Sequence, residues 1–235
     1  MTERHFHEQL QSLKERLMEM AALVEDAISK SIQALVARDD ALAENVVKRD
    51  DAINRLEITI DHISLRLLAL QQPMAVDLRF ITSAMKINND LERMGDHAVN
   101  IAQLAILLSQ ENHLKPLDNL PEMAEITQTM VRESLRSFVE ADEKLARNVC
   151  RRDDDVDRFD DRIFHELLSC MIRDSANIPR AVHLVLISKN LERIADLSTN
   201  IAEEVIFIYK ARNIKHHRED VPWKDMDIED VRSRS

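Results

Sequence analysis

The sequence contains very little glycine, proline or aromatic residue. Of its 235 residues, one is Gly, five are Pro and 3% are aromatic. Sandwiches, barrels and doubly wound sheets need many tight turns, which Gly and Pro supply, so these folds are excluded. Because 45% of the residues are apolar and 32% are charged, we expect an all-α protein with a core of Leu, Ile, Val, Met and Ala packed between helices.

An excess of basic residues is also absent. The chain has 32 Lys and Arg against 43 Asp and Glu, a formal net charge of −11, which argues against binding to nucleic acid or anionic lipid. No apolar run approaches the roughly 20 residues of a membrane span, and the polar start MTERH is unlike a signal peptide. We therefore expect no transmembrane segment. The two cysteines, Cys150 and Cys170, form no CxxC pair, which fits a reducing compartment, so we expect a cytoplasmic protein.

The chain contains an internal duplication, which is the most informative feature of the sequence. Residues in 42–51 recur in 145–154, so that Asp50 returns as Asp153. Residues in 91–102 recur in 191–202. Because matching residues recur at a nearly constant separation of about 100 positions, the chain holds two consecutive copies of one folding unit.

Apolar residues at helical spacing, interrupted by Asp and Pro, predict three helices in each copy. We therefore expect two tandem three-helix bundles in an elongated molecule. The first repeat covers residues 1–112, the second 113–212, and a polar, mobile tail 213–235. Asp39, Asp40 and Asp142 are expected to cap helices. The predicted helices span residues 5–37, 41–71, 76–111, 119–140, 144–174 and 178–212.

Acidic and amide side chains form stripes on the last two helices of each copy. Residues three, four or seven positions apart lie on one helix face. In the first copy the stripes are Asp50, Asn54, Glu57 and Asp61, and Glu92, Asp96 and Asn100; in the second they are Asp153, Asp157 and Asp160, and Glu192, Asp196, Asn200 and Glu203.

The two stripes of each copy are expected to face each other. Counting outward from a turn at residues 73–74 brings Asp50 level with residue 97 and Glu57 level with residue 90. In the second hairpin, a turn near residue 175 brings Asp160 level with residue 190. Converging carboxylates repel unless a proton or a cation neutralises them, and oxygen ligands suit Mg, Mn, Ca or Fe better than a thiolate-type zinc site.

Two interpretations of the stripes stay open at this point. The first is a cation site in each copy. The second is a solvated charged face, because charge runs usually serve solubility. Arginines close in the sequence offer counterions for that second case: Arg49, Arg55, Arg93, Arg152, Arg158 and Arg193.

The motifs around these stripes resemble the PhoU family. Residues 71–81, QQPMAVDLRFI, followed by 91–97, LERMGDH, carry the likeness in the first copy. Residues 190–196, NLERIAD, with 200–203, NIAE, carry it in the second. The likeness extends over residues 5–212. It implies two three-helix bundles that bind metal through E/D-x-x-x-D motifs.

Carried over residue by residue, the resemblance implies carboxylate pairs that hold a divalent or trivalent ion, either Fe, Mn, Mg or Zn. Asn54 stands where the second copy has Asp157, and Phe164 stands where the first has Asp61, so the two copies differ as metal sites. The implied pairs are Glu57 with Asp61, Glu92 with Asp96, Asp153 with Asp157, Asp157 with Asp161, and Glu192 with Asp196.

The resemblance also implies a function. PhoU proteins repress phosphate uptake and phosphate-starvation signalling in bacteria, with two partners: the ATPase subunit of the phosphate ABC transporter and the phosphate sensor histidine kinase. We expect a helical adaptor without enzymatic activity that forms a homodimer through exposed apolar faces. The alternatives are a di-iron oxidase or ferroxidase, disfavoured because the chain has no E-x-x-H motif, and a metal-free structural adaptor.

Overall fold

The protein is described by a computed structural model of residues 3–112, 114, 119–213 and 221–222, and long α-helices account for nearly all of it. The helices are α1 (Glu3–Ala37), α2 (Asp40–Gln71), α3 (Ala75–Ser109), α4 (Asn119–Glu140), α5 (Glu143–Arg173) and α6 (Ile178–Lys210). A 3-10 helix, η1 (Ser175–Asn177), leads into α6. Two short strands, β1 (Arg212–Asn213) and β2 (Val221–Pro222), pair antiparallel.

The all-α prediction and its six helices are confirmed, and no helix end differs from its predicted position by more than two residues. The sequence did not indicate η1 or the strands. Across the described residues, no helix is long and apolar enough to cross a membrane. The repeat boundaries stay predictions. Residues 113 and 115–118 of the linker, and 214–220 and 223–235 of the tail that we expected to be mobile, lie outside the described residues.

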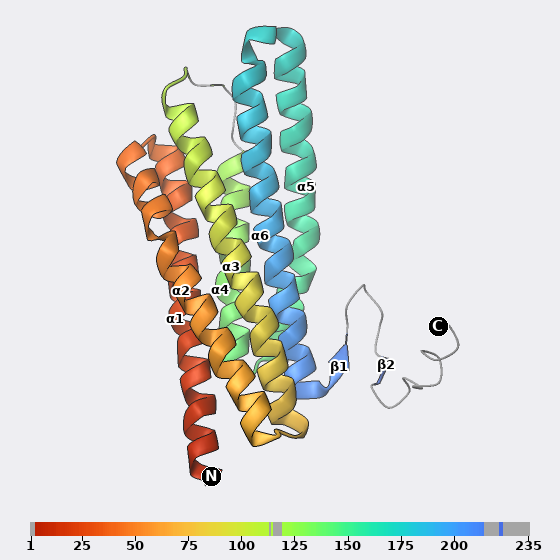
Figure 1. Cartoon of the computed structure of the whole chain (residues 1–235). Coiled ribbons are helices and arrows are strands. Elements are labelled where there is room, and N and C mark those ends of the chain that lie inside the picture. The colour runs from red at the N-terminus through yellow and green to blue at the C-terminus, as the bar shows by residue number, and fades with distance from the viewer. Residues whose placement is uncertain (1–2, 113, 115–118, 214–220, 223–235) are drawn as a thin grey trace, which may run out of the picture.

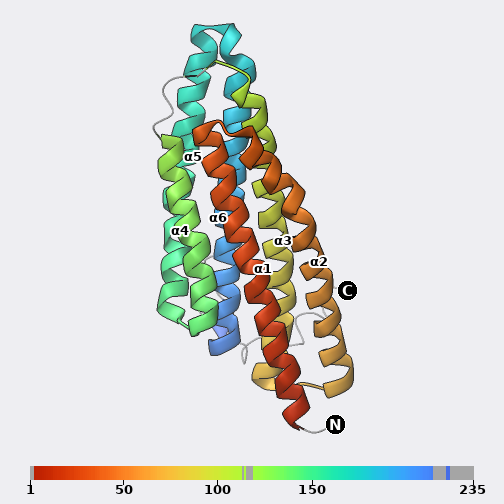
Figure 2. The ribbon, with the colours of Figure 1, turned by 90° about the vertical axis from the view of Figure 1, so that its left-hand side faces the viewer.

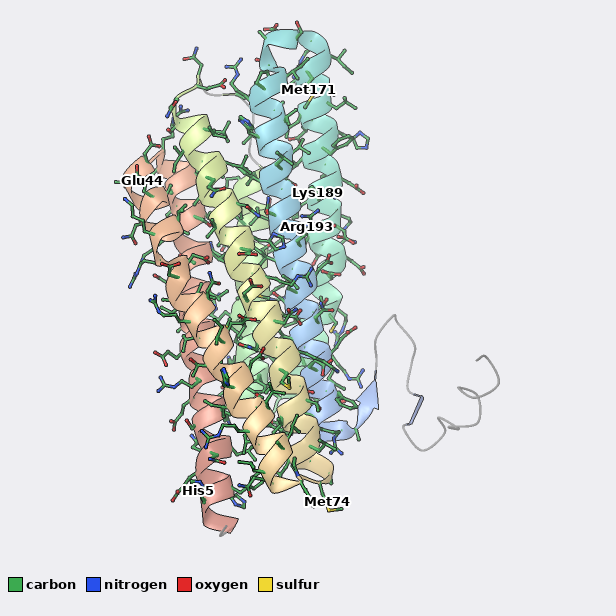
Figure 3. All side chains as sticks on the ribbon, in the orientation of Figure 1. His5, Glu44, Met74, Met171, Lys189 and Arg193 are labelled. Atoms are coloured by element: carbon green, nitrogen blue, oxygen red, sulfur yellow. The ribbon has the colours of Figure 1, made fainter. Side chains whose placement is uncertain are left out.

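The helices form two bundles, α1–α3 and α4–α6, which meet along α3 and α6. These two helices lie side by side in the middle of the molecule (Figure 1), and α1 passes in front of them next to α4 (Figure 2). The α2–α3 turn and the α5–α6 turn lie at opposite ends of the elongated molecule, near Met74 and Met171 respectively (Figure 3). The turns of the two hairpins are therefore far apart.

Two aspartates cap helices as expected, and a third does not. The Asp39 carboxylate accepts a hydrogen bond from the Leu42 N–H at 3.0 Å, and Asp142 accepts from the N–H groups of Lys144 and Leu145. The prediction for Asp40 was wrong, because α2 begins at this residue. There its negative charge faces the positive end of the helix dipole.

Most of the core is one continuous cluster of buried apolar side chains that draws on both repeats, and a smaller cluster of Ala34, Ala43, Val46 and Ala102 lies within the first repeat. Leu17 and Met94 of the first repeat belong to the same cluster as Leu191 of the second. The rings of Phe80 and Phe138 stack with centroids 5.7 Å apart across the two bundles. Since neighbouring helices of both bundles bury these side chains together, the hydrophobic stabilisation of each repeat depends on the other.

Buried polar contacts fix the register between α3 and α6. The Glu204 side chain is buried and accepts hydrogen bonds from the Ser83 hydroxyl at 2.7 Å and from Lys86 Nζ at 3.0 Å. Further along, His97 Nδ1 and Asn190 Oδ1 are hydrogen-bonded at 2.9 Å. A buried carboxylate without partners is costly, so these contacts disfavour any other register of the two helices.

Gly95, the only glycine, lies inside α3 where α2 passes closely. A Cβ at this position would lie 3.1 Å from Ile53 Cδ1 and 3.6 Å from Asp50 Oδ1. Small size, and not turn formation, explains this glycine, as the alanine at the equivalent position 195 indicates. The close approach holds α2 and α3 at the distance where their acidic stripes interact.

We expect Gly95→Leu to lower the free energy of unfolding by about 1–3 kcal/mol, because the added side chain overpacks against Ile53. Gly95→Ala should change it by no more than about 1 kcal/mol, since its contact is with the end of a flexible side chain and Ala favours the helix. Urea denaturation followed by circular dichroism measures both. A Gly95→Leu protein as stable as the wild type would contradict this account of the α2–α3 contact.

Candidate metal centre

The α2–α3 hairpin brings its acidic stripes together as the counting from the turn predicted. Asp96 and Asp50 are close enough for the charge of one to raise the pKa of the other. Glu92 interacts in the same way with Asp96, Glu57 and Asp50, after burial, which is the largest cause of its raised pKa. We call the set Asp50, Glu57, Asp61, Glu92 and Asp96 the first acidic cluster.

One oxygen of Asp50 lacks a partner. Burial raises the pKa of Asp50, the hydrogen bond from Asn54 opposes this rise, and the charges of Asp96 and Asp51 add to it. Asn54 Nδ2 donates to Oδ2 at 2.9 Å. Oδ1 is buried, and no hydrogen-bond donor among the described residues reaches it. A buried carboxylate oxygen with no donor is what a cation in this groove would neutralise.

An asparagine that the sequence did not single out also contacts the first acidic cluster. Asn88 of α3 donates its amide hydrogens to Asp61 Oδ1 at 3.1 Å and to the Glu57 carbonyl at 3.0 Å. Its side chain therefore orients Asp61 at the end of the cluster nearer the turn. The signal that could have found it is its position, level with Glu57 and Asp61 across the hairpin.

The α5–α6 hairpin carries the second acidic cluster, Asp153, Asp157, Asp160, Asp161, Glu192 and Asp196. Burial raises the pKa of the Asp153 carboxyl to about 7, and the charges of Asp196 and Asp157 add to the effect. Partial loss of hydration also raises the pKa values of Asp157, Glu192 and Asp196, although the Asp157 and Asp196 residues are exposed. The two stripes of this hairpin therefore face each other too.

Asp160 differs from the rest of the second acidic cluster because both of its oxygens have partners. The residue is 5% exposed. The Ser188 hydroxyl donates to Oδ1 at 2.6 Å, and Lys189 Nζ lies 2.5 Å from Oδ2. Lys189 Nζ is also 3.7 Å from Glu192 Oε1. Sequence analysis missed this lysine, although it lies opposite Asp160 by the same counting from the turn.

Three predicted residues are not among the acids that define these two clusters. Asn100 Nδ2 donates to Asn190 Oδ1 at 3.3 Å, between α3 and α6. Asn200 lines a shallow polar depression of about 360 Å³ on the same helix pair, together with Glu204. The charge of Glu203 acts on Cys150 of α5, where burial is the main cause that raises the thiol pKa to about 11. Asn100 and Asn200 thus lie at the α3–α6 contact, whereas Glu203 faces α5 near Cys150, on which Asp153 also acts.

The nearby arginines pair mainly with other acids. Among the six arginines considered as counterions, Arg49 pairs with Asp26, Arg152 with Glu133, Arg93 with Asp90 and Arg158 with Asp155. None of these acids belongs to the predicted set. Arg93 lowers the pKa of Glu92, and Arg193 lowers that of Asp196, but both effects are smaller than that of burial. The clusters thus keep negative charge that arginine does not neutralise.

The donor chemistry of both clusters fits a hard cation. All donors are carboxylate or amide oxygens, as Mg, Mn and Fe prefer, and Asp50 Oδ1 offers an unshared buried oxygen. As the described side chains stand, no three His, Cys, Asp or Glu residues surround one point as a ligand set. An ion could be held by either cluster only if carboxylates rotated about their side-chain bonds to converge on it.

We expect metal-free protein to lose stability as the pH rises from about 4 to 7, because folded Asp153 keeps a proton that the unfolded chain releases over this range. In Asp153→Asn, the thermal midpoint should fall less over the same interval. Differential scanning calorimetry in EDTA measures it, with Glu44→Gln, at an exposed acid of α2 that pairs with Lys48, as the control. Equal pH dependence in wild type and Asp153→Asn would contradict the raised pKa.

Comparison with known proteins identifies the family. The sequence model of the PhoU domain matches residues 17–105 and again 120–205. The chain is 44% identical to the "Phosphate-specific transport system accessory protein PhoU homolog" of Aquifex aeolicus over 208 residues, 88% of this chain and 94% of the relative. It is 37% identical to the protein of the same name from Clostridium acetobutylicum, over 91% of this chain and 98% of that protein.

Solved structures agree with this assignment. The crystal structure of PhoU from Pseudomonas aeruginosa superposes with a TM-score of 0.86 at 36% identity, over 88% of this chain and 99% of that one. The phosphate transport system regulatory protein PhoU from Streptococcus pneumoniae gives 0.82 at 31% identity, over 88% and 97%. The PhoU domain model matches the chain twice, and relatives and solved structures match most of its length. The chain therefore belongs to the PhoU family.

Proposed function

We propose that this protein regulates phosphate transport and represses phosphate-starvation signalling as a metal-binding helical adaptor in the cytoplasm. Relatives that match most of the chain are named as accessory proteins of the phosphate-specific transport system. The observation that carries the metal-binding part is the pair of carboxylate clusters that nearby arginines leave largely unneutralised. The proposed partners are the ATPase subunit of the phosphate ABC transporter and the sensor histidine kinase.

The ions would be held by the two acidic clusters. Asp50 and Asp96 come from facing helices of the first hairpin, and Asp153 and Asp196 from facing helices of the second. A bound ion, Fe, Mn, Mg or Zn, supplies positive charge between carboxylates that otherwise repel. The facing helices would then be tied together, which stiffens each hairpin.

The two acidic clusters lack the residues of a di-iron oxidase. A di-iron oxidase of the bundle type needs a Glu-x-x-His pair on each of two helices, and the sequence has none. His97, the histidine next to Asp96, is hydrogen-bonded to Asn190 at the α3–α6 contact. An adaptor that carries ions as structural or regulatory groups suits these residues better than a redox enzyme.

We expect Asp96→Ala and Asp196→Ala each to remove bound metal and to release a phosphate-regulated reporter from repression in a deletion strain. The reason is that each substitution removes a carboxylate from the middle of one cluster. Metal analysis of natively purified protein measures the first effect. Glu44→Ala, which removes an exposed acid that pairs with Lys48, should change neither result.

The metal-free adaptor remains the competing interpretation of the clusters. It predicts that chelation changes neither the metal content nor the thermal midpoint of the purified wild type. That outcome, with repression intact in both variants, would contradict metal-dependent regulation while leaving the adaptor role in place.

An exposed apolar surface on the second hairpin suits a contact between two copies of the chain. Phe164, Leu168 and Ile172 follow one another at intervals of four on α5 and are 45%, 39% and 78% exposed. Ile178, Val182 and Leu186 do the same on α6, at 44%, 41% and 45%. We call these six residues the tip face. The equivalent six positions of the first repeat include two large apolar residues, Leu65 and Leu78.

We expect the protein to form a homodimer through the tip face, since a two-fold interface places the same apolar patch on both subunits. Leu168→Glu should weaken dimerisation by at least about tenfold, because a charge would be buried without a partner. Sedimentation equilibrium measures this, with Leu65→Glu, the equivalent change in the first repeat, as the control. A monomeric wild type, or a Leu168→Glu dimer of unchanged affinity, would contradict the proposal.

A further inference from the structure

The two acidic clusters differ by one cation that belongs to the protein itself. In the second acidic cluster, Lys189 Nζ lies 2.5 Å from Asp160 Oδ2 and 3.7 Å from Glu192 Oε1. By the duplication, the equivalent of Lys189 in the first repeat is Asn89, which carries no charge. The equivalent of Asp160 is Glu57. The position equivalent to Lys189 therefore carries no charge in the first repeat, where Asn89 lines the polar depression between α3 and α6.

Lys189 is placed to neutralise the most buried acid of its cluster. Asp160 is 5% exposed, and its other oxygen accepts the Ser188 hydroxyl. The charge on Lys189 also lowers the pKa values of Asp157, Glu192 and Asp196. One ammonium group thus acts on four carboxylates of the second acidic cluster.

The first acidic cluster has no such group. Within the described ranges, none of its five carboxylates forms an ion pair with Lys, Arg or His at 4.0 Å or less. Its polar partners are amides: Asn54 bonds to Asp50 and Asn88 bonds to Asp61. Oδ1 of Asp50 stays buried without a donor. Apart from the charge of Arg93, which acts weakly on Glu92, this cluster therefore depends on a proton or an external cation for neutralisation.

The Lys189 side chain is bound to Asp160 but is exposed enough to move into solvent. Its side chain is 47% exposed, and a lysine ammonium is a point charge on a flexible four-carbon stem. A metal ion that binds Asp160 and Glu192 must displace it and repel it, because both carry positive charge. Metal binding in the second repeat therefore competes with an internal cation, whereas binding in the first does not.

We propose that Lys189 is a built-in counter-cation that lowers the metal affinity of the second acidic cluster below that of the first. This inference rests on the proposed metal binding. The first cluster fills at low metal concentration, and the second fills only when the concentration suffices to displace Lys189. The duplicated sites thus respond to two different ranges of metal concentration.

The test is a calorimetric titration of the metal-free full-length protein with Mn²⁺. The wild type should show two affinities, which Asp96→Ala and Asp196→Ala assign to the first and second clusters. Lys189→Asn, which copies the first repeat, should raise the affinity of the second cluster about tenfold or more, the scale of one adjacent unit charge in a partly solvated site. Asn89→Lys should lower the affinity of the first cluster correspondingly.

Two controls separate charge from structure. Lys189→Arg keeps the positive charge and should keep the low affinity of the second cluster. Lys48→Asn removes a lysine that pairs with Glu44 on the surface and should change neither affinity. In metal-free solution Lys189→Asn should also lower the thermal midpoint, because Asp160 loses its counter-cation, and Mn²⁺ should restore it.

The outcomes distinguish this inference from the function on which it rests. If the wild type binds Mn²⁺ and Lys189→Asn leaves the second affinity unchanged, the role of Lys189 is wrong and metal binding stands. If neither the wild type nor Lys189→Asn binds Mn²⁺, Mg²⁺, Zn²⁺ or Fe²⁺, both are wrong.

Discussion

Repulsion between carboxylates on facing helices is the constraint on which the rest of this structure depends. An antiparallel hairpin with a fixed turn places the acids of one helix level with those of the next. The close contact at Gly95 and Ile53 keeps α2 and α3 near enough for the acids to interact. Partial burial then raises the pKa of Asp50, Glu92 and Asp153. A chain with net charge −11 retains this arrangement although it opposes folding at neutral pH, which favours a role in binding cations.

The sequence predicted the six helices and the facing stripes because both follow from simple periodicities. Apolar spacing determines which residues are helical, and the turns at Pro73 and near residue 175 determine which residues of a hairpin are level. The counting placed Asp50 beside Asp96 and Asp160 beside residue 190, as found. The proximity of Asp50 and Asp96 is seen in the effect of the Asp96 charge on the pKa of Asp50. Asp160 forms a 2.5 Å ion pair with Lys189, the neighbour of residue 190.

Contacts between the two repeats were beyond the reach of that counting. Asn100 continues the stripe of Glu92 and Asp96 but bonds to Asn190 on α6, because a stripe at intervals of four drifts around the helix toward its other neighbour. The partners of the arginines were equally hidden, since Arg49 reaches Asp26 on α1 and Arg152 reaches Glu133 on α4. Lys189 is a different case, because the counting from the turn near residue 175 already brings it level with Asp160.

The buried Glu204 bears on how a protein of this kind arises. Its carboxylate lies in the second repeat, and its donors, Ser83 and Lys86, lie in the first. A polypeptide of half this length would expose the apolar side of its third helix and would leave such an acid without its hydrogen-bond donors. It would need a second copy of itself to cover that side. Joining two such halves in one chain would turn a concentration-dependent association into a permanent one and would let each half change alone. The leucine at position 104, the equivalent in the first repeat of the acid at 204, is an example of such a difference.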